Sequence, residues 1–452
     1  MNNLDYKLLA NKIFEKGKEK LEELEVYIQS SKDIEIGIFG GEIDNYAISE
    51  SGGLSLRGIV NDKMGYSYTE KIDESSIDML VDEALENGKY IDSADKESIF
   101  SGSDKYEKTN TYSDSLEKTP MEDKINFLKN LEKEALSLDS RVSNVQMCIY
   151  QEMSAEKYLI NTKGLDLADK MSGAFAFVYV IVKDGEEVKN GTSFRGFNDF
   201  SKFDYKEMAK EAVDEAISML GASSIKSSDY PVIIRNTTFA DIISAFSPVF
   251  SADNVQKGLS LLKDKIGSQV ANELLTMVDN PFLEGGFGTR SFDDEGTATR
   301  VNKIIDKGVL KTHLHNWKTA EKDKIESTGN GTRSSYKGSL SISPSNLYIE
   351  KGNNTYDELV GSIDKGLIII DVAGLHSGLN TVSGDFSLSA YGYEIENGKI
   401  KRPVDLITIA GNLYEVLNNI EAIGDDLKFG WPGAGYIGSP SIKIKSLSVA
   451  GE

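Results

Sequence analysis

Three histidines, at positions 313, 315 and 376, are the side chains of this sequence best suited to metal or acid–base chemistry. His313 and His315 flank one residue in VLKTHLHNW, and on a predicted strand they would share one face. His376 lies in the loop GLHSG after a predicted buried strand over 366–372. No histidine precedes a glutamate, so the helical H-E-x-x-H zinc motif is absent. The three histidines are weak metal-site candidates, and the alternative is an ordinary polar strand and loop.

Other catalytic motifs are scarce. The sequence has no G-x-S-x-G elbow and no phosphate loop of the G-x-x-x-x-G-K-[ST] type. One G-x-G-x-x-G occurs, at Gly433, Gly435 and Gly438, but a β-like run follows it where a dinucleotide site needs a helix. The single cysteine, Cys148, lies in an apolar run, which predicts a buried structural thiol and excludes a disulfide within the chain.

Two small, polar loops could present backbone amides to a ligand: STGNGTRSSY (327–336) and NTVSGDF (380–386). Within the second loop, Asn380, Ser383, Gly384 and Asp385 are the candidate peptide-binding residues. Either loop could equally be a plain surface turn. Exposed loops together with strand edges would suit the capture of a peptide by strand addition.

The 452 residues carry a net charge of −22, with 39% hydrophobic and 27% charged residues. Such a surface repels phosphates, so direct nucleic-acid binding is not expected. No run approaches the length of a membrane span, and the N-terminus lacks the apolar core of a signal peptide. The single cysteine fits a reducing compartment, so we expect a soluble, cytoplasmic protein that does not bind membranes.

The first half of the chain alternates helical and β-like patterns. Helical spacing predicts helices over 4–24, 74–88, 119–138 and 204–220. Between them, alternating apolar runs separated by turn residues predict short antiparallel strands at 25–29, 33–39, 43–49, 53–60, 63–68, 141–151, 155–161, 165–183 and 187–195. The polar segment 92–118 is predicted to be a long connection.

The small, polar stretch GASSIKSSD (221–229) is the predicted main domain boundary. A strand at 231–235, helices over 237–247 and 253–264, and then a mostly β, glycine-rich remainder follow it. The predicted fold class is α+β, with two large domains built on antiparallel sheets with flanking helices. The N-terminal domain covers 1–222, with two parts at about 1–92 and 115–222, and the C-terminal domain covers 230–452.

Several strings of the second half resemble the TldD/PmbA family, whose members are also called modulators of DNA gyrase. They include GFGTRSFDDEGTATR (286–300), STGNGTRSS (327–335) and the run LNTVSGDFSLSAYGYEIENGKIKRPVDLITIAGNLYEVLNNIEAIGDDL (379–427). A weaker match lies in DNYAISESGGLSLRGIVNDKMGYSYT (44–69), so the resemblance covers nearly the whole chain.

The resemblance implies two branches with different roles. TldD-type members hold zinc for peptide hydrolysis with an H-E-x-x-x-H helix and a cysteine near the C-terminus, and PmbA/TldE-type members lack these ligands and pair with a TldD-type subunit. The matching helix here is TFADIISAFSPVF (238–250), whose only acidic residue is Asp241, and 424–440 contains no cysteine. The closest match is the PmbA branch, and no catalytic residue carries over.

The resemblance therefore implies a subunit that has no cofactor of its own and shapes a peptide cleft, while a TldD-type partner holds zinc in a heterodimer. The substrates implied are unfolded or modified peptides. Two alternatives stay open. One is an independent peptide-binding homodimer, and the other is a metallopeptidase with a relocated metal site around His313, His315 and His376.

Overall fold

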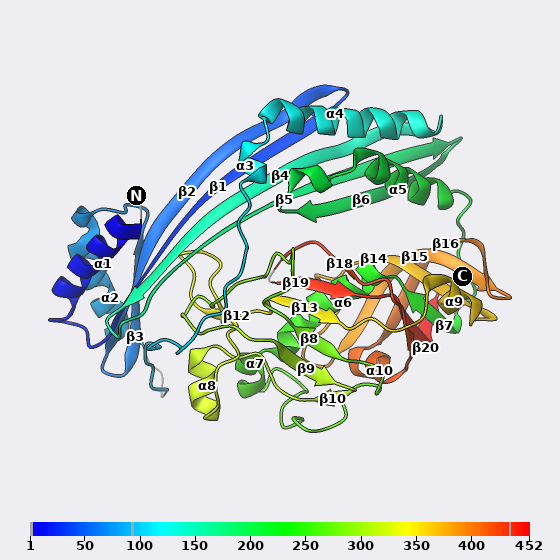
Figure 1. Cartoon of the computed structure of the whole chain (residues 1–452). Coiled ribbons are helices and arrows are strands. Elements are labelled where there is room, and N and C mark those ends of the chain that lie inside the picture. Colours follow the sequence, from blue (N-terminus) through cyan, green and yellow to red (C-terminus); the bar gives the residue numbers. More distant parts are fainter. Residues whose placement is uncertain (1–2, 92–94, 434) are drawn as a thin grey trace.

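A curved, six-stranded antiparallel sheet dominates the first half of the chain (Figure 1). The computed structural model describes residues 3–91, 95–433 and 435–452. The strand order is β3-β2-β1-β4-β5-β6. The bounds are β1 (Leu24–Phe39), β2 (Glu42–Val60), β3 (Lys63–Thr69), β4 (Val142–Asn161), β5 (Asp166–Asp184) and β6 (Glu187–Phe197). The predicted α+β class with antiparallel sheets is confirmed.

Three of these strands are much longer than the sequence predicts. The predicted pairs 25–29 with 33–39, 43–49 with 53–60, and 141–151 with 155–161 are each one continuous strand, β1, β2 and β4. The apolar pattern is interrupted within each strand because one face of the sheet is covered by two separate helix pairs. Between the pairs, residues such as Ser30 to Lys32 have no helix above them, so they are polar although they stay in the sheet.

The helices of the first half lie on that same face. α1 (Asn3–Gly17) and α2 (Ile77–Lys89) cover one end of the sheet, and α4 (Met121–Leu138) and α5 (Tyr205–Ser218) cover the other (Figure 1). The short α3 (Ser115–Lys118) precedes α4. The predicted helix 4–24 is too long, because α1 ends at Gly17 and Leu24 already belongs to β1. Cys148 is buried beneath α4, as predicted, and its thiol donates to the Leu128 carbonyl at 3.4 Å.

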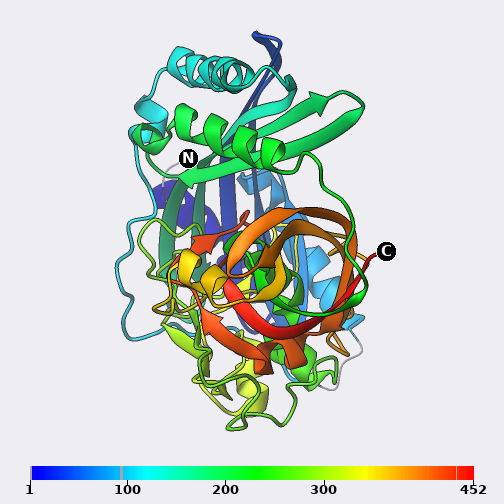
Figure 2. The same ribbon diagram turned by 90° about the vertical axis from the view of Figure 1, so that its right-hand side faces the viewer.

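A barrel-like sheet organises the second half of the chain (Figure 2). Its order is β16-β15-β14-β7-β20-β17, and a further pairing of β16 with β20 closes five strands into a ring. The bounds are β7 (Ser228–Ile234), β14 (Lys365–Ala373), β15 (Asp385–Glu396), β16 (Lys399–Asn412), β17 (Ile420–Ile423) and β20 (Ile442–Ala450). β7 and β14 run parallel, and the other neighbours are antiparallel.

A second six-stranded sheet, β10-β9-β8-β13-β19-β18, packs beside the barrel. It consists of β8 (Met277–Asp279), β9 (Asn302–Asp306), β10 (Val309–Leu310), β13 (Asn346–Ile349), β18 (Lys428–Phe429) and β19 (Tyr436–Ser439), and β11 (Gly331–Thr332) pairs separately with β12 (Ser341–Ile342). The helices of this half are α6 (Asn236–Phe246), α7 (Ala252–Gln256), α8 (Trp317–Asp323), α9 (Tyr356–Gly361) and α10 (Leu413–Asn418). The predicted helix over 253–264 is wrong in extent, because α7 ends before Gly258, whose φ is +74°.

The connection before α3, residues 95–113, runs across the second half of the chain (Figure 1). Residues 95–113 contain no helix or strand, and Tyr106 donates its hydroxyl to the Gly296 carbonyl at 2.8 Å. The connection therefore ties the two halves together. None of the helices in the described residues is both long enough and apolar enough to span a membrane.

Candidate functional site

Helix α6 is the element that bears most directly on metal chemistry, and it packs against β18 and β19 of the second sheet and against β14 of the barrel. Thr238, Phe239, Ile242, Ile243 and Phe246 are buried, and the Thr238 hydroxyl donates to the Ile370 carbonyl of β14 at 2.6 Å. Most of the surface of this helix is therefore buried in the core. One short side of it, which carries Asp241, is left for any polar role.

Asp241 lies beneath the loop that follows β18. A Cβ added at Gly430 would lie 2.8 Å from Asp241 Oδ1, so the backbone of this loop passes close to the carboxylate. Burial, and next the nearby carboxylate of Asp371, raise the pKa of Asp241 to about 6, while Arg235 opposes this rise. A carboxyl group with such a pKa could exchange a proton near neutral pH.

The groups around Asp241 come from three elements. Arg235 directly precedes α6 and forms an ion pair with Glu215 of α5, so it is shared between the two halves of the chain. Asp371, on β14, accepts a hydrogen bond from the Tyr391 hydroxyl at 3.1 Å. Two carboxylates thus lie near one arginine, which already has another partner.

This donor set does not fit zinc. A zinc site needs three or four nitrogen, sulfur or carboxylate ligands in tetrahedral positions. Within α6 only Asp241 is of a ligand type, and the loop above it, 430–433, consists of glycine, tryptophan and proline. In the described part of the chain, no group of three or more His, Cys, Asp and Glu side chains is arranged to hold a metal ion.

Aromatic rings occupy the space above this helix, where the two halves meet. The ring centroid of Trp431 lies 4.5 Å from that of Phe194 and 5.9 Å from that of Phe175. Both phenylalanines lie on the face of the long sheet that carries no helices. Phe287 approaches Phe175 to 4.5 Å from the other side. Trp431 is nevertheless 47% exposed, so the ring cluster is open to solvent on one side.

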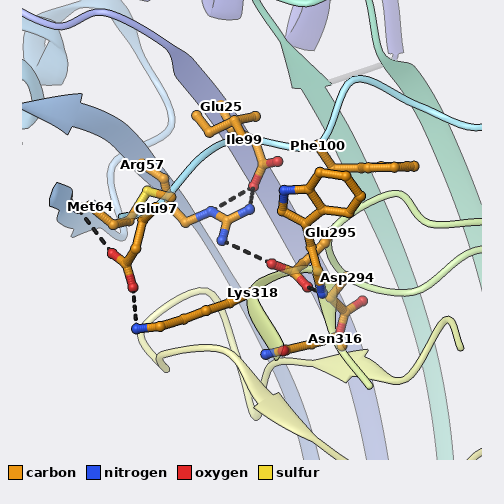
Figure 3. Close-up of polar contacts among 12 residues, drawn as sticks. Glu25, Arg57, Met64, Glu97, Ile99, Phe100, Asp294, Glu295, Asn316 and Lys318 are labelled. Carbon is orange, nitrogen blue, oxygen red and sulfur yellow. Dashed lines mark hydrogen bonds and ion pairs between the residues drawn. The ribbon is translucent and has the colours of Figure 1, made fainter. Parts of the chain in front are cut away.

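A second polar cluster joins the halves at the other end of the long sheet (Figure 3). Arg57 of β2 donates from Nε to Glu25 Oε1 of β1 at 2.9 Å, and its Nη1 lies 3.4 Å from Glu295 Oε1. Arg333 donates from Nη2 to the same Glu25 oxygen at 2.9 Å. Glu295 also accepts from the Trp317 amide at 2.7 Å. These side chains are almost completely buried, so the cluster holds the halves together without offering a free site.

His313 and His315 are buried, at 4% and 0% exposure, and their segment forms one isolated bridge at Leu314 where a strand was predicted. Neither ring nitrogen of His315 has a hydrogen-bond partner. Burial lowers the pKa of His315 to about 4, against the opposing effect of Asp323, so the ring is neutral at pH 7. His376, by contrast, lies exposed in the turn after β14. The histidines are not grouped with further ligands in the described residues.

The candidate residues Asn380, Ser383, Gly384 and Asp385 come together in one tight turn before β15. Asn380 Oδ1 accepts from the amides of Val382 and Ser383, at 2.9 and 3.2 Å, and Ser383 donates its hydroxyl to Asp385 Oδ2 at 2.7 Å. The amides of Asn380 and Gly384 are also used inside the turn. A ligand at this turn would therefore meet side chains more than free amides.

The loop 327–336 is not a surface turn. Ser327 and Thr328 donate their hydroxyls to the His315 carbonyl, and Asn330 donates to Asp279 at 2.8 Å. The amide of Gly331 donates to Asp293 at 2.9 Å. The loop is therefore held inside the protein by hydrogen bonds to neighbouring segments, and its small polar residues have a structural role. The last glycine of the G-x-G-x-x-G run, Gly438, lies in β19, and β20 follows it instead of a helix, as predicted.

Sequence reasoning singled out Asp241 but missed its surroundings and the cluster in Figure 3. Asp371, Arg235 and Glu215 belong to three elements, and no spacing rule connects them. One signal was present in the sequence: Arg57 and Glu25 interrupt apolar runs that form strands. A charged residue inside such a run is expected to have a buried partner of opposite charge.

Three consecutive parts of the chain match one protein family. Residues 24–88 match the family description "PmbA/TldA metallopeptidase domain 1", residues 114–220 the "PmbA/TldA metallopeptidase central domain", and residues 227–451 the "PmbA/TldA metallopeptidase C-terminal domain". Among curated relatives, a "Metalloprotease PmbA homolog" of Buchnera aphidicola is 26% identical over 89% of this chain and 88% of its own length. A "Metalloprotease TldD homolog" of the same organism is 28% identical over 88% of this chain and 86% of its own length.

Solved structures have the same fold. A protein of Thermotoga maritima, described as a proposed modulator of a DNA gyrase, is 33% identical, with a TM-score of 0.90 over 98% of this chain and all of its own. TldE from Thermococcus kodakarensis has a TM-score of 0.90 over 98% of this chain and all of its own, at 23% identity, which supports the fold alone.

Proposed function

Because the chain belongs to the PmbA/TldA metallopeptidase family, we propose that it is a PmbA/TldE-like subunit of a zinc protease that acts on unfolded or modified peptides. In this proposal the chain does not hold the zinc ion itself. It forms a heterodimer with a TldD-type subunit, which supplies the metal and the peptide-bond cleavage.

One observation carries the proposal: the donor set at α6. The helix offers a single carboxylate, from Asp241, and the loop above it offers Gly430 and Trp431 in place of a thiolate. One carboxylate cannot complete a zinc site, so no hydrolytic step is assigned to this chain. The described residues support a binding and positioning role, through the open aromatic cluster around Trp431.

The relatives favour pairing within the family. Curated relatives of this chain carry the names of both branches, PmbA and TldD, at similar identity. Two proteins of one fold can form a pseudo-symmetric pair in which only one member keeps the catalytic groups. The proposed heterodimer is such a pair.

The test is a peptidase assay on an unfolded protein substrate, with the purified chain alone, with zinc added, and with a TldD-type relative added. We expect no cleavage in the first two samples and faster cleavage in the third than with the relative alone. Cleavage by the lone chain that a chelator stops would overturn the proposal. If it also disappeared in His315→Ala, the relocated metal site would be favoured instead.

A further inference from the structure

The outer strand β2 leaves one stretch of its edge without a neighbour. β3 pairs only with residues 54–60 of β2, and β1 pairs along its other side. In the described residues, no strand pairs with the outer edge of residues 42–51 (Figure 1), which we call the free edge. All ten of these residues are exposed. Unpaired amides and carbonyls on such an edge can accept a further strand.

The free edge is held rigidly at its tip. The turn between β1 and β2 consists of Gly40 and Gly41, with φ of +61° and +80°. Their amides donate to the two carboxylate oxygens of Glu132 on α4, each at 2.7 Å. Glu132 is itself buried, at 3% exposure, so the hairpin is fixed to the helix layer. A strand that added to this edge would meet a preorganised partner.

Apolar side chains continue from the core onto the free edge. Ile34, Ile36 and Ile38 of β1 are buried beneath the helices, and they pair with Ile48, Tyr46 and Ile43 of β2. A register shift next to Gly37 keeps Ile43 in this row. The three β2 side chains are 46–49% exposed. Ile48 also lines a groove of about 390 Å³, in which Leu116 and Met121 are apolar neighbours and Lys32 and Lys118 are charged ones.

The opposite face beside the free edge is acidic and has small side chains. Asn45, Ala47 and Ser49 pair with Gly37, Glu35 and Asp33 of β1. Neither Asp33 nor Glu35 forms an ion pair with a described Lys or Arg. Glu35 accepts hydrogen bonds from the side-chain amides of Asn45 and Gln151, and Asp33 accepts one from the Ser31 hydroxyl. The free edge itself has three acidic residues and no Lys, Arg or Pro. It thus lacks the lysine or proline that commonly protects exposed edges.

We propose that the free edge binds an extended peptide substrate in which apolar residues alternate with Lys or Arg. The peptide pairs with β2 as an added strand. Its apolar side chains contact Ile43, Tyr46 and Ile48, and its basic side chains reach over Ala47 to Asp33 and Glu35. A second copy of this chain fits less well, because two free edges side by side would bring six carboxylates together, and Lys32, 4.0 Å from Glu50, is the cation that each copy would contribute beside them.

This inference deepens the proposed function, on which its biological meaning rests, by naming the class of peptide that is bound. The binding test needs neither a partner nor hydrolysis. A failed peptidase assay and a failed binding assay therefore contradict different statements.

The test uses the full chain and a fluorescent nine-residue peptide that alternates Lys and Val, titrated by anisotropy at low salt. The same peptide with Glu in place of Lys is the control ligand. We expect binding of the Lys peptide at least tenfold tighter than that of the Glu peptide, weakened by added salt. Hydrogen exchange should show protection of residues 42–51 on binding.

Two variants locate the site. Ile48→Lys removes an apolar contact and adds a positive charge at the free edge, and roughly a tenfold loss of affinity is expected. Leu274→Lys is the matched control, because Leu274 is similarly exposed, at 52%, but lies in the other half of the chain. Equal binding of both peptides, no binding, or unchanged affinity in Ile48→Lys would overturn the proposal. So would a stable dimer of the lone chain that Ile48→Lys dissociates, since a second copy would then occupy the edge.

Discussion

The protein buries charge in two places where its halves meet, and it compensates that charge differently. At the far end of the long sheet, Arg57 and Arg333 alternate with Glu25 and Glu295, so that each of these four charges lies beside an opposite one. Burial and the charge of Glu295 raise the pKa of the neighbouring Asp293, which lies outside these ion pairs. At α6, Asp241 and Asp371 share one arginine, which is already paired with Glu215. We call the first cluster (Glu25, Arg57, Glu295 and Arg333) the lock, because its ion pairs hold the two halves together. In the second cluster one carboxyl group lacks a full counter-charge, which lowers the stability of the folded chain.

This difference distinguishes charges that stabilise the fold from a charge that lowers stability. A charge of the second kind is explained by a function or as an evolutionary remnant. A buried ion pair with both partners present is tolerated, whereas one charge left alone is strongly unfavourable. Asp241 survives at a position where it raises the free energy of the folded chain at neutral pH. The proposed partner subunit or a bound peptide could supply the missing counter-charge.

The largest expected effect comes from breaking the lock. Arg57→Met removes the cation that lies between Glu25 and Glu295 and leaves two buried carboxylates without it. We expect the free energy of unfolding to fall by about 3–5 kcal/mol. Urea denaturation at pH 7, followed by circular dichroism, measures it. A loss below about 1 kcal/mol would show that the cluster is not a lock.

An effect of opposite sign is expected at α6. The folded pKa of Asp241, about 6, lies above its ordinary value of 3.8, so the folded chain binds more protons between pH 4 and pH 6. Stability from this group is therefore lost as the pH rises through that window. Asp241→Asn should raise the free energy of unfolding at pH 7 by up to about 3 kcal/mol, the equivalent of about two pKa units, and have little effect at pH 4.

Thermal unfolding of the wild type and Asp241→Asn at pH 4 and pH 7 tests this sign. Asp253→Asn is a suitable control, because Asp253 forms an exposed pair with Lys257 one helical turn away. Equal destabilisation of the Asp241 variant at both pH values would mean that its carboxylate is compensated, and the contrast between the two clusters would fail.

The smallest effect is expected at an exposed pair. Arg300 and Glu326 lie 3.0 Å apart with side-chain exposures of 44% and 89%. Arg300→Met should change the free energy of unfolding by less than about 1 kcal/mol. The same urea experiment compares Arg300→Met with Arg57→Met. Both variants replace an ion-paired arginine with methionine, but Arg57 is buried and Arg300 is exposed. Equal losses for both would show that burial does not set the scale.

Local pattern predicted much of the secondary structure but not its continuity. The helices near 74–88, 119–138 and 204–220 correspond closely to α2, α4 and α5, because their apolar faces repeat over several turns. The strands were divided wherever polar residues such as Ser30 or Ser51 break the pattern. Those residues lie between two helix pairs, and a gap in helix cover cannot be read from one strand alone.

The candidate site was predictable only in part. The lack of ligands in 238–250 is visible in the sequence, and so is the single carboxylate of Asp241. Its neighbours Asp371 and Arg235 come from β14 and the end of β7, which the barrel brings together. His313 and His315 were predicted on a strand face, but their burial depends on contacts with residues 327–330 that no local pattern shows.

The central claim is that this chain does not hold the zinc ion of its family. Isothermal titration of the metal-free chain with zinc tests it most directly, with a TldD-type relative as the positive control and His315→Ala as the matched variant. We predict no stoichiometric binding at micromolar zinc by the lone chain or the variant, and clear binding by the relative. One zinc ion bound tightly per lone chain would contradict the account, and its loss in His315→Ala would place the metal at the buried histidines.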